Sequence, residues 1–124
     1  MKMAIAFVTA AMAGTAAAGA LEECMIRGDH AAVTRCLVEG DKDAQASLNK
    51  AEGDAGKRAR DIDTATGRSS AAPALAKSMR AFADYKKVQC DFVRAIYASS
   101  SSADQAQIGC MIDLTRRRVR ELQF

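Results

Sequence analysis

The feature that most constrains the fold of this chain is its set of four cysteines. They lie at Cys24, Cys36, Cys90 and Cys110. In a short exported chain, an even number of cysteines predicts a disulfide framework, because the compartment outside the cytoplasm is oxidising. Four cysteines allow three pairings, and their count alone does not choose among them. The 124 residues are enough for one modest domain, so two cross-links would supply a large share of its stability.

The N-terminal segment indicates export. It carries a positive charge at Lys2, an apolar and alanine-rich run, and no acidic residue before Glu22. The small residues of Ala18-Gly19-Ala20 are typical of a signal peptidase cleavage site, and the run is too short and small in volume to span a membrane. We therefore expect a signal peptide over residues 1–20 and a single domain over residues 21–124. That domain should be periplasmic or secreted, with no membrane insertion after cleavage.

Other functional classes find little support in the composition. Zinc sites usually take ligands from close pairs such as Cys-x2-Cys, whereas these cysteines are separated by eleven, fifty-three and nineteen residues. His30 is the only histidine, and we expect no metal and no other cofactor. The net charge of +3 is weak, which argues against nucleic acid as a partner. Asp61 and Asp63 lie in a polar stretch without an apolar pocket to raise a pKa, so we expect no enzyme.

Helix is the secondary structure that the composition favours, because alanine is abundant, proline occurs once and no stretch alternates with period two. A first helix is expected from about residue 29 to about residue 60, which Gly40 and Asp41 could interrupt. Residues 61–70 are expected to form a loop. The apolar stripe of the first helix consists of Val33, Leu37, Ala44, Leu48, Ala51 and Ala55.

Two further helices are expected in the C-terminal half. The second helix begins near Pro73, because proline is tolerated in the first turn. Its predicted core stripe is Leu75, Ser78, Phe82, Tyr85, Gln89, Phe92 and Ile96. After a four-serine break, Ser102 and Gln105 fit a capping box at the start of the third helix. The third helix has a stripe of Ile108, Ile112, Thr115, Val119 and Leu122, and its last turns hold Arg116, Arg117, Arg118 and Arg120.

A short turn near Ser100 predicts that the second and third helices form an antiparallel hairpin. Cys90 and Cys110 each lie ten residues from Ser100, so they should be level and close enough for a disulfide. Cys24 must then pair with Cys36, which one straight helix forbids, because their separation would span about 18 Å at 1.5 Å per residue. We therefore expect the segment of Cys24 to fold back over the first helix. The predicted fold is a small all-α antiparallel bundle of three to four helices, with a long C-terminal hairpin and two disulfides.

The hairpin register also places Arg118 opposite Phe82 and Thr115 opposite Tyr85. We expect the Arg118 guanidinium to lie over the Phe82 ring and to pair with Glu121 three residues later. These are structural contacts, so we interpret the five residues as packing residues and not as a binding site.

Several segments occur in a characteristic order and spacing. They are Cys24-x11-Cys36, then Ala44 with Leu48-Asn49, then Ser78-Met79-Arg80-Ala81-Phe82-Ala83-Asp84-Tyr85-Lys86-Lys87-Val88-Gln89-Cys90, and finally Cys110-Met111-Ile112-Asp113-Leu114-Thr115-x-x-Arg118-x-x-Glu121-Leu122. Together they resemble the N-terminal domain of the LprI-type lysozyme inhibitors, a family of small exported bacterial proteins. The chain departs from the family pattern where Phe82 replaces a tryptophan, where Lys86-Lys87 replaces arginine-aspartate, and where no tyrosine follows Leu48-Asn49.

The resemblance implies a protein that binds a muramidase and blocks its substrate cleft. Host lysozymes of the common type are strongly basic, so an inhibitor is expected to present acidic groups. The candidate contact residues are Glu39, Asp41 and Asp43. The alternative is an envelope interaction protein, secretion-associated or stress-related and without lysozyme activity, whose partner would meet the arginines at positions 116–120. The sequence leaves the oligomeric state open.

Overall fold

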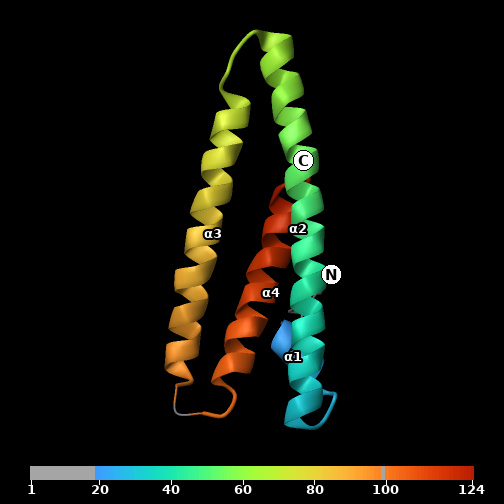
Figure 1. The fold of residues 1–124 in the computed structure, drawn as a ribbon, viewed down its shortest axis with the longest axis vertical. Helices are drawn as coiled ribbons and strands as arrows, with labels where there is room; N and C mark the ends of the chain where they lie inside the picture. The colour runs from blue at the N-terminus through green and yellow to red at the C-terminus, as the bar shows by residue number, and fades with distance from the viewer. Residues whose placement is uncertain (1–18, 99) are drawn as a thin grey trace, which may run out of the picture.

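The structure, a computed structural model, describes residues 19–98 and 100–124 and contains four α-helices (Figure 1). They are α1 (Ala20–Met25), α2 (His30–Thr66), α3 (Ala71–Ile96) and α4 (Ala103–Glu121). The predicted all-α fold is confirmed, and these described ranges hold no strand. Residues 1–18, most of the expected signal peptide, lie outside the described residues, so the signal peptide stays a prediction.

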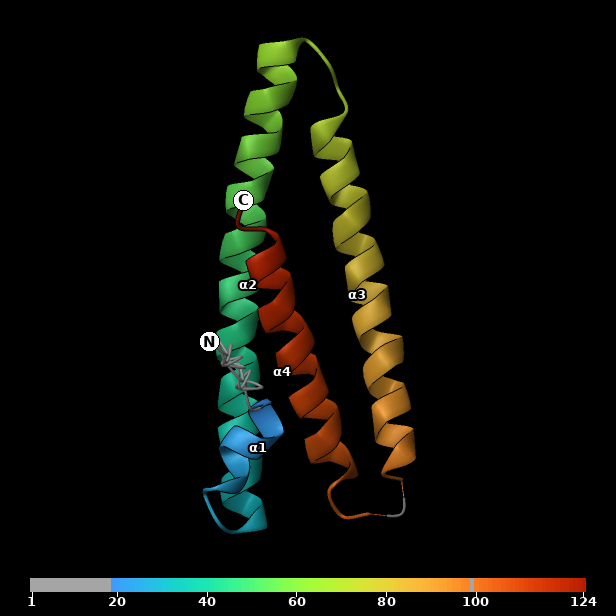
Figure 2. The ribbon, with the colours of Figure 1, turned by 180° about the vertical axis from the view of Figure 1, so that it is seen from behind.

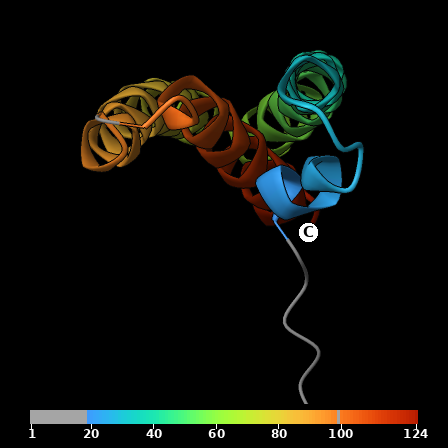
Figure 3. The ribbon, with the colours of Figure 1, turned by 90° about the horizontal axis from the view of Figure 1, so that it is seen from below.

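The centre of the bundle is α4. It contacts each of the other three helices, and it lies between α2 and α3 in Figures 1 and 2. Both α2 and α3 extend beyond the C-terminal end of α4 and are joined at their far end by residues 67–70. In the view from below, α1 lies against α2 and α4 and away from α3 (Figure 3). One side of α3 is therefore left at the outer edge of the bundle.

The first long helix, α2, is a single helix of 37 residues, so the interruption considered near Gly40 and Asp41 is absent. Its predicted stripe is confirmed, since Val33, Leu37, Ala44, Leu48, Ala51 and Ala55 are all buried. A Cβ on Gly40 would lie 3.3 Å from Ile112 Cδ1 of α4. The absence of a side chain at Gly40 therefore allows α2 and α4 to approach closely, and it does not break α2.

The loop predicted over residues 61–70 is wrong for its first six residues, because α2 continues to Thr66. Within the last turns, the Thr66 hydroxyl donates to the carbonyl of Ile62 at 2.8 Å. Gly67 ends the helix with a left-handed φ of 66°, and the Arg68 N–H donates to the Asp63 carbonyl at 3.1 Å. The glycine, and not the polar composition before it, sets the end of the helix.

The core stripe predicted for α3 is wrong in its C-terminal half. Tyr85, Phe92 and Ile96 are 50%, 58% and 64% exposed, whereas Cys90 is buried. The reason is that α4 packs against only one side of α3, and that side is rotated away from the predicted stripe. Pro73 does lie in the first turn of α3, as predicted.

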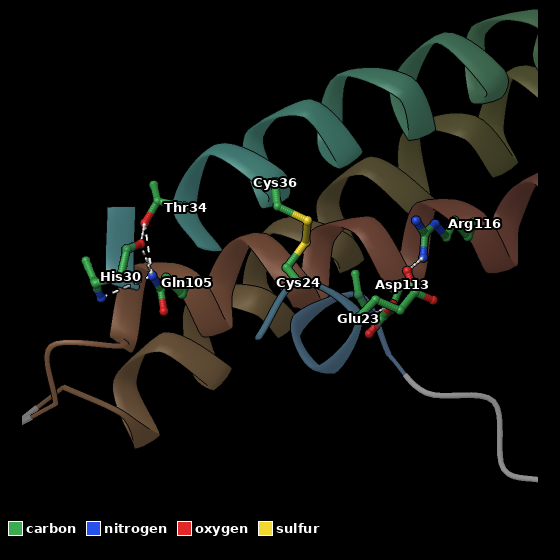
Figure 4. Close-up of a disulfide and its surroundings, with 9 residues drawn as sticks. Glu23, Cys24, His30, Thr34, Cys36, Gln105, Asp113 and Arg116 are labelled. Atoms are coloured by element: carbon green, nitrogen blue, oxygen red, sulfur yellow. Dashed lines mark hydrogen bonds and ion pairs between the residues drawn. A yellow bond between two sulfur atoms is a disulfide. The ribbon is translucent and has the colours of Figure 1, made fainter. Parts of the chain in front are cut away.

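Both predicted disulfides are confirmed. The Cα atoms of Cys24 and Cys36 lie 5.6 Å apart, as do those of Cys90 and Cys110. The chain reverses between α1 and α2 through a turn in which Gly28 has a φ of 101°, and this reversal brings Cys24 beside Cys36 (Figure 4). One disulfide fastens α1 to α2, and the other fastens α3 to α4.

The buried residues form two clusters. The first, which we call the base cluster, consists of Ala20, Cys24, Val33, Leu37, Ala44 and Ile112. The second, the arm cluster, consists of Leu48, Ala51, Ala55 and Leu122, with Leu75, Phe82 and Val119 packed against it. The predicted stripe of α4 contributes to both clusters through Ile112 and Leu122. In the part of the chain that the structure describes, no helix combines the length and apolar character needed to cross a membrane.

Candidate protein-binding site

The three acidic residues predicted to contact a partner all lie on α2, but they do not share one face. Glu39 and Asp43 are exposed and four residues apart, so they lie on the same side of the helix. Asp41 follows Leu37 by four residues and precedes Ala44 by three, which places it along the buried stripe, and it is half-buried. The structure therefore brings two of the three residues together.

Asp43 lines an open surface groove between α2 and α4. The other residues lining it are Gly40, Ala44, Ser47, Arg116, Val119 and Arg120. An acidic side of α2 thus meets a basic side of α4 across the groove. Glu39 and Asp43 stand at the border of a surface with mixed charge, and not at the centre of an acidic one.

Further carboxylates lie next to this groove on α1 and α4. Glu23 Oε2 accepts a hydrogen bond from Arg116 Nη1 at 3.1 Å, and both side chains stay partly exposed. Asp113 Oδ1 accepts the backbone N–H of Ala20 at 2.9 Å. Figure 4 shows Glu23, Asp113 and Arg116 gathered where α1 meets α4. Arg116 fastens α1 to α4 and neutralises part of the acidic charge there.

The arginines of α4 do not form one patch for a partner. Arg116 pairs with Glu23, and Arg118 pairs with Glu121 at 3.6 Å. Arg117 and Arg120 are the two that the structure leaves exposed. These two arginines are three residues apart in the sequence, so they lie on one side of α4.

Arg118 makes structural contacts in the arm cluster. Its guanidinium carbon lies 5.6 Å from the centre of the Phe82 ring, and Nη2 donates to the Ser78 hydroxyl at 2.7 Å. Its side chain is 13% exposed. The guanidinium therefore covers the Phe82 ring, and we assign Arg118 to packing.

Thr115 faces Lys86 and not Tyr85. The Lys86 ammonium donates to Thr115 Oγ1 at 3.2 Å and lies 5.6 Å from the centre of the Phe82 ring. Thr115 is almost fully buried at 1% exposed, whereas Tyr85 is half exposed. The register expected for the hairpin is off by one residue here, because α3 is rotated relative to the predicted stripe.

Gln105 has a role that the sequence pattern does not reveal. The predicted capping box is wrong, because the Ser102 side chain makes no capping hydrogen bond. The buried Gln105 amide instead reaches across to the start of α2, where Nε2 donates to the His30 carbonyl at 3.0 Å and to Thr34 Oγ1 at 2.9 Å (Figure 4). The same nitrogen lies 3.1 Å from His30 Nδ1. Because this contact spans helices far apart in sequence, no local motif could have predicted it.

Asp61 and Asp63 lie in α2 and have structural partners. Asp61 Oδ2 lies 2.6 Å from the Lys57 ammonium. The Asp63 carboxylate accepts the backbone N–H groups of Ala72, Ala71 and Ser70 at 2.9, 2.8 and 3.1 Å. These hydrogen bonds, led by the one from Ala72, lower the pKa of Asp63 below its ordinary value. In its charged form, the Asp63 carboxylate therefore caps the first turn of α3.

An exposed apolar stripe runs along the outer side of α3. It consists of Tyr85, Val88, Phe92 and Ile96, which are 50%, 63%, 58% and 64% exposed. Their spacing of three and four residues places them on one side of the helix. Exposed apolar residues grouped in this way are typical of a surface that binds another protein.

Among the residues described, no three His, Cys, Asp or Glu side chains lie close enough together to bind a metal ion.

In comparison with known proteins, the family model described as "Lysozyme inhibitor LprI" matches residues 24–122. That span holds both disulfides, all of α2, α3 and α4, and the last two residues of α1. No curated protein and no solved structure matches the chain.

Proposed function

The chain belongs to the LprI lysozyme inhibitor family, and from that premise we propose that it binds a lysozyme outside the cytoplasm and blocks its substrate cleft. The observation that carries the proposal is the extent of the match, which covers residues 24–122 with all four cysteines. The protein acts by occupying a surface and catalyses no reaction. Export by the expected signal peptide delivers it to the compartment where its disulfides form.

The surface that we propose for this contact includes Glu39 and Asp43. Both carboxylates are exposed, they share a side of α2, and they belong to the half of the molecule that the disulfides hold rigid. A strongly basic target favours exposed carboxylates, because complementary charge raises the rate of encounter and orients the partner. Asp41, on the buried stripe, contributes less in this arrangement.

The test is a titration of purified, oxidised protein against a panel of lysozymes, with the rate of cell-wall hydrolysis measured at two salt concentrations. We expect stoichiometric inhibition of one lysozyme that weakens at the higher salt. The double variant Glu39→Gln/Asp43→Asn should inhibit about threefold to tenfold more weakly, since exposed ion pairs contribute about 0.2–1 kcal/mol each. Absence of inhibition across the panel would reject the proposed activity.

A matched control comes from the other end of the same helix. Asp54 and Asp61 are exposed acidic residues of α2 that pair with Lys50 and Lys57. The variant Asp54→Asn/Asp61→Asn changes the net charge by the same amount as the test variant and should inhibit like the wild type. Equal loss in both variants would mean that only total charge matters, and the proposed surface would be wrong.

A second candidate function is supported by the exposed apolar stripe of α3. An envelope interaction protein without lysozyme activity would use this stripe, defined by Tyr85, Val88, Phe92 and Ile96, to hold its partner. The variant Val88→Ser/Phe92→Ser separates the two functions, with Ala83→Ser as the control on an exposed part of α3 outside the stripe. This second function is favoured if the wild type inhibits no lysozyme but binds an envelope partner, and if Val88→Ser/Phe92→Ser no longer binds that partner.

A further inference from the structure

The first residues of α1 are built into the core. Ala20 is 1% exposed and belongs to the base cluster, where it packs with Cys24, Leu37 and Ile112. Its backbone N–H donates to Asp113 Oδ1 of α4 at 2.9 Å. One residue later, Leu21 lies so close to α4 that a Cβ on Gly109 would be 3.1 Å from the Leu21 Cβ. A domain without Ala20 would lose part of its own core.

Gly19 is also part of the folded domain. Its carbonyl accepts the N–H of Glu23 at 3.0 Å, which is a first-turn hydrogen bond of α1. Two carboxylates converge on it, since a Cβ on Gly19 would lie 2.7 Å from Glu22 Oε2 and 2.8 Å from Asp113 Oδ2. A side chain does not fit there without moving these groups, whereas a positive charge next to them would be stabilised.

We propose that signal peptidase cleaves the bond between Ala18 and Gly19, and not the bond after Ala20, so that the exported protein begins at Gly19. In this hydrolysis water adds across the peptide bond, leaving a carboxylate on Ala18 and an ammonium on Gly19. Ala16-Ala17-Ala18 supplies the small residues that the peptidase requires at the third and first positions before the cut. The inference depends on export but not on lysozyme inhibition, so either can fail without the other.

The electrostatics of α1 favour the same terminus. A positive charge alone at the start of a helix is unfavourable, because the helix dipole is positive there. At Gly19 the carboxylates of Glu22 and Asp113 offset this repulsion. A cut after Ala20 would remove the buried methyl group of Ala20 and the Gly19 carbonyl that accepts the N–H of Glu23.

The test is to express the full chain of residues 1–124 in a bacterium and to measure the intact mass of the exported product. A mass that corresponds to residues 19–124 is expected. A product that begins at Leu21, or an exported chain that keeps residues 1–18, would overturn the proposal. The two cleaved products differ by one glycine and one alanine residue, which mass spectrometry resolves.

Two variants locate the cut independently of the mass. Ala16→Lys places a charge at the third position before the proposed bond, where the peptidase needs a small residue, and the product that begins at Gly19 should be lost. Thr15→Lys adds the same charge one residue earlier and should be processed like the wild type. If both variants are processed equally, the proposed bond is wrong.

A stability measurement tests the structural reason. A chain of residues 19–124 should unfold several degrees higher than a chain of residues 21–124, because only the longer one fills the site of Ala20. Equal unfolding temperatures would show that the domain does not use residues 19 and 20, and the inference would lose its basis.

Discussion

The two ends of this molecule are held together in different ways. At one end, the base cluster is formed by residues of α1, α2 and α4, and its Leu37 and Ile112 are fully buried. Both disulfides brace this end of the bundle, and α1, which one of them joins to α2, lies in the lower half of Figure 1. At the other end, α2 and α3 extend past α4 as a two-helix arm that closes at residues 67–70 (Figure 2). The base is cross-linked, and the arm is not.

The arm also buries smaller side chains. Along α2 its buried residues after Leu48 are Ala51, Ala55 and Ala59, and an alanine removes little apolar surface from water. Asp63 offsets this smaller apolar burial at the far end of the arm, where its carboxylate accepts hydrogen bonds from three backbone N–H groups at the start of α3. This chain therefore relies on disulfides at the base and on helix capping in the arm, where its core is thin. We expect the arm to open before the base.

The largest expected effect is the loss of both disulfides. Replacing all four cysteines by serine should lower the free energy of unfolding by about 2–4 kcal/mol for each bond, because the unfolded chain gains freedom. The stability advantage of the base over the arm should then become smaller. Urea denaturation with and without reductant measures this, and an unchanged midpoint would contradict the view that the disulfides hold the base.

Next in size is a cavity in the base. Leu37→Ala should lower the free energy of unfolding by about 2–5 kcal/mol, because Leu37 is 0% exposed. The same substitution at the half-buried Leu75 of the arm is the matched variant and should cost less. Chemical denaturation of both variants makes the comparison, and an equal loss would mean that the arm is packed as tightly as the base.

A smaller effect is expected from Asp63→Asn, and it should be confined to the arm. The hydrogen bonds from Ala72, Ala71 and Ser70 lower the pKa of Asp63, so its charged form stabilises the folded state. This contribution is present above the unfolded pKa of about 3.9 and is lost as the pH falls through the lower folded pKa. In Asp63→Asn, hydrogen exchange at the start of α3 should be faster at neutral pH and less dependent on acid.

The control for this variant is Asp61→Asn, which removes the same charge two residues earlier. Asp61 contacts Lys57 and no backbone N–H of α3. Its substitution should leave exchange at residues 70–72 unchanged. If both variants open the arm equally, charge and not capping by Asp63 is responsible.

The smallest effect concerns the exposed ion pairs of α2. The side chains of Lys57 and Asp61 are 74% and 63% exposed, so Lys57→Gln should lower the free energy of unfolding by about 0.5 kcal/mol or less. The difference should vanish at high salt. A loss above about 1 kcal/mol would show that this pair contributes more to the arm than an exposed helical pair normally does.

Sequence periodicity predicted the centre of the fold better than its edges. The predicted stripe of α2 is buried, and the residues of the predicted α4 stripe are all buried or partly buried. The stripe of α3 has the same periodicity, yet Phe92 and Ile96 are exposed. Spacing identifies which residues share a side of a helix, but it does not tell whether another helix covers that side.

The candidate contact residues show the same limit. Their number and sign are evident from the sequence, and their position on one helix is as expected. The structure separates Asp41 from Glu39 and Asp43 by the rotation of the helix, and it brings Arg116 and Arg120 to the groove beside Asp43. Neither result follows from the local sequence, because the groove is formed by helices about seventy residues apart in the chain.

The all-α fold, the pairing of the cysteines and the family could be predicted from the sequence, because helix propensity, hairpin register and motif spacing are encoded locally or by simple geometry. The tertiary structure was needed to find the exposed side of α3, the hydrogen bond from Gln105 to His30 and the burial of Ala20. These features depend on how α4 lies between its neighbours. Such packing arises from contacts between segments that are distant in the sequence, so local sequence patterns do not predict it.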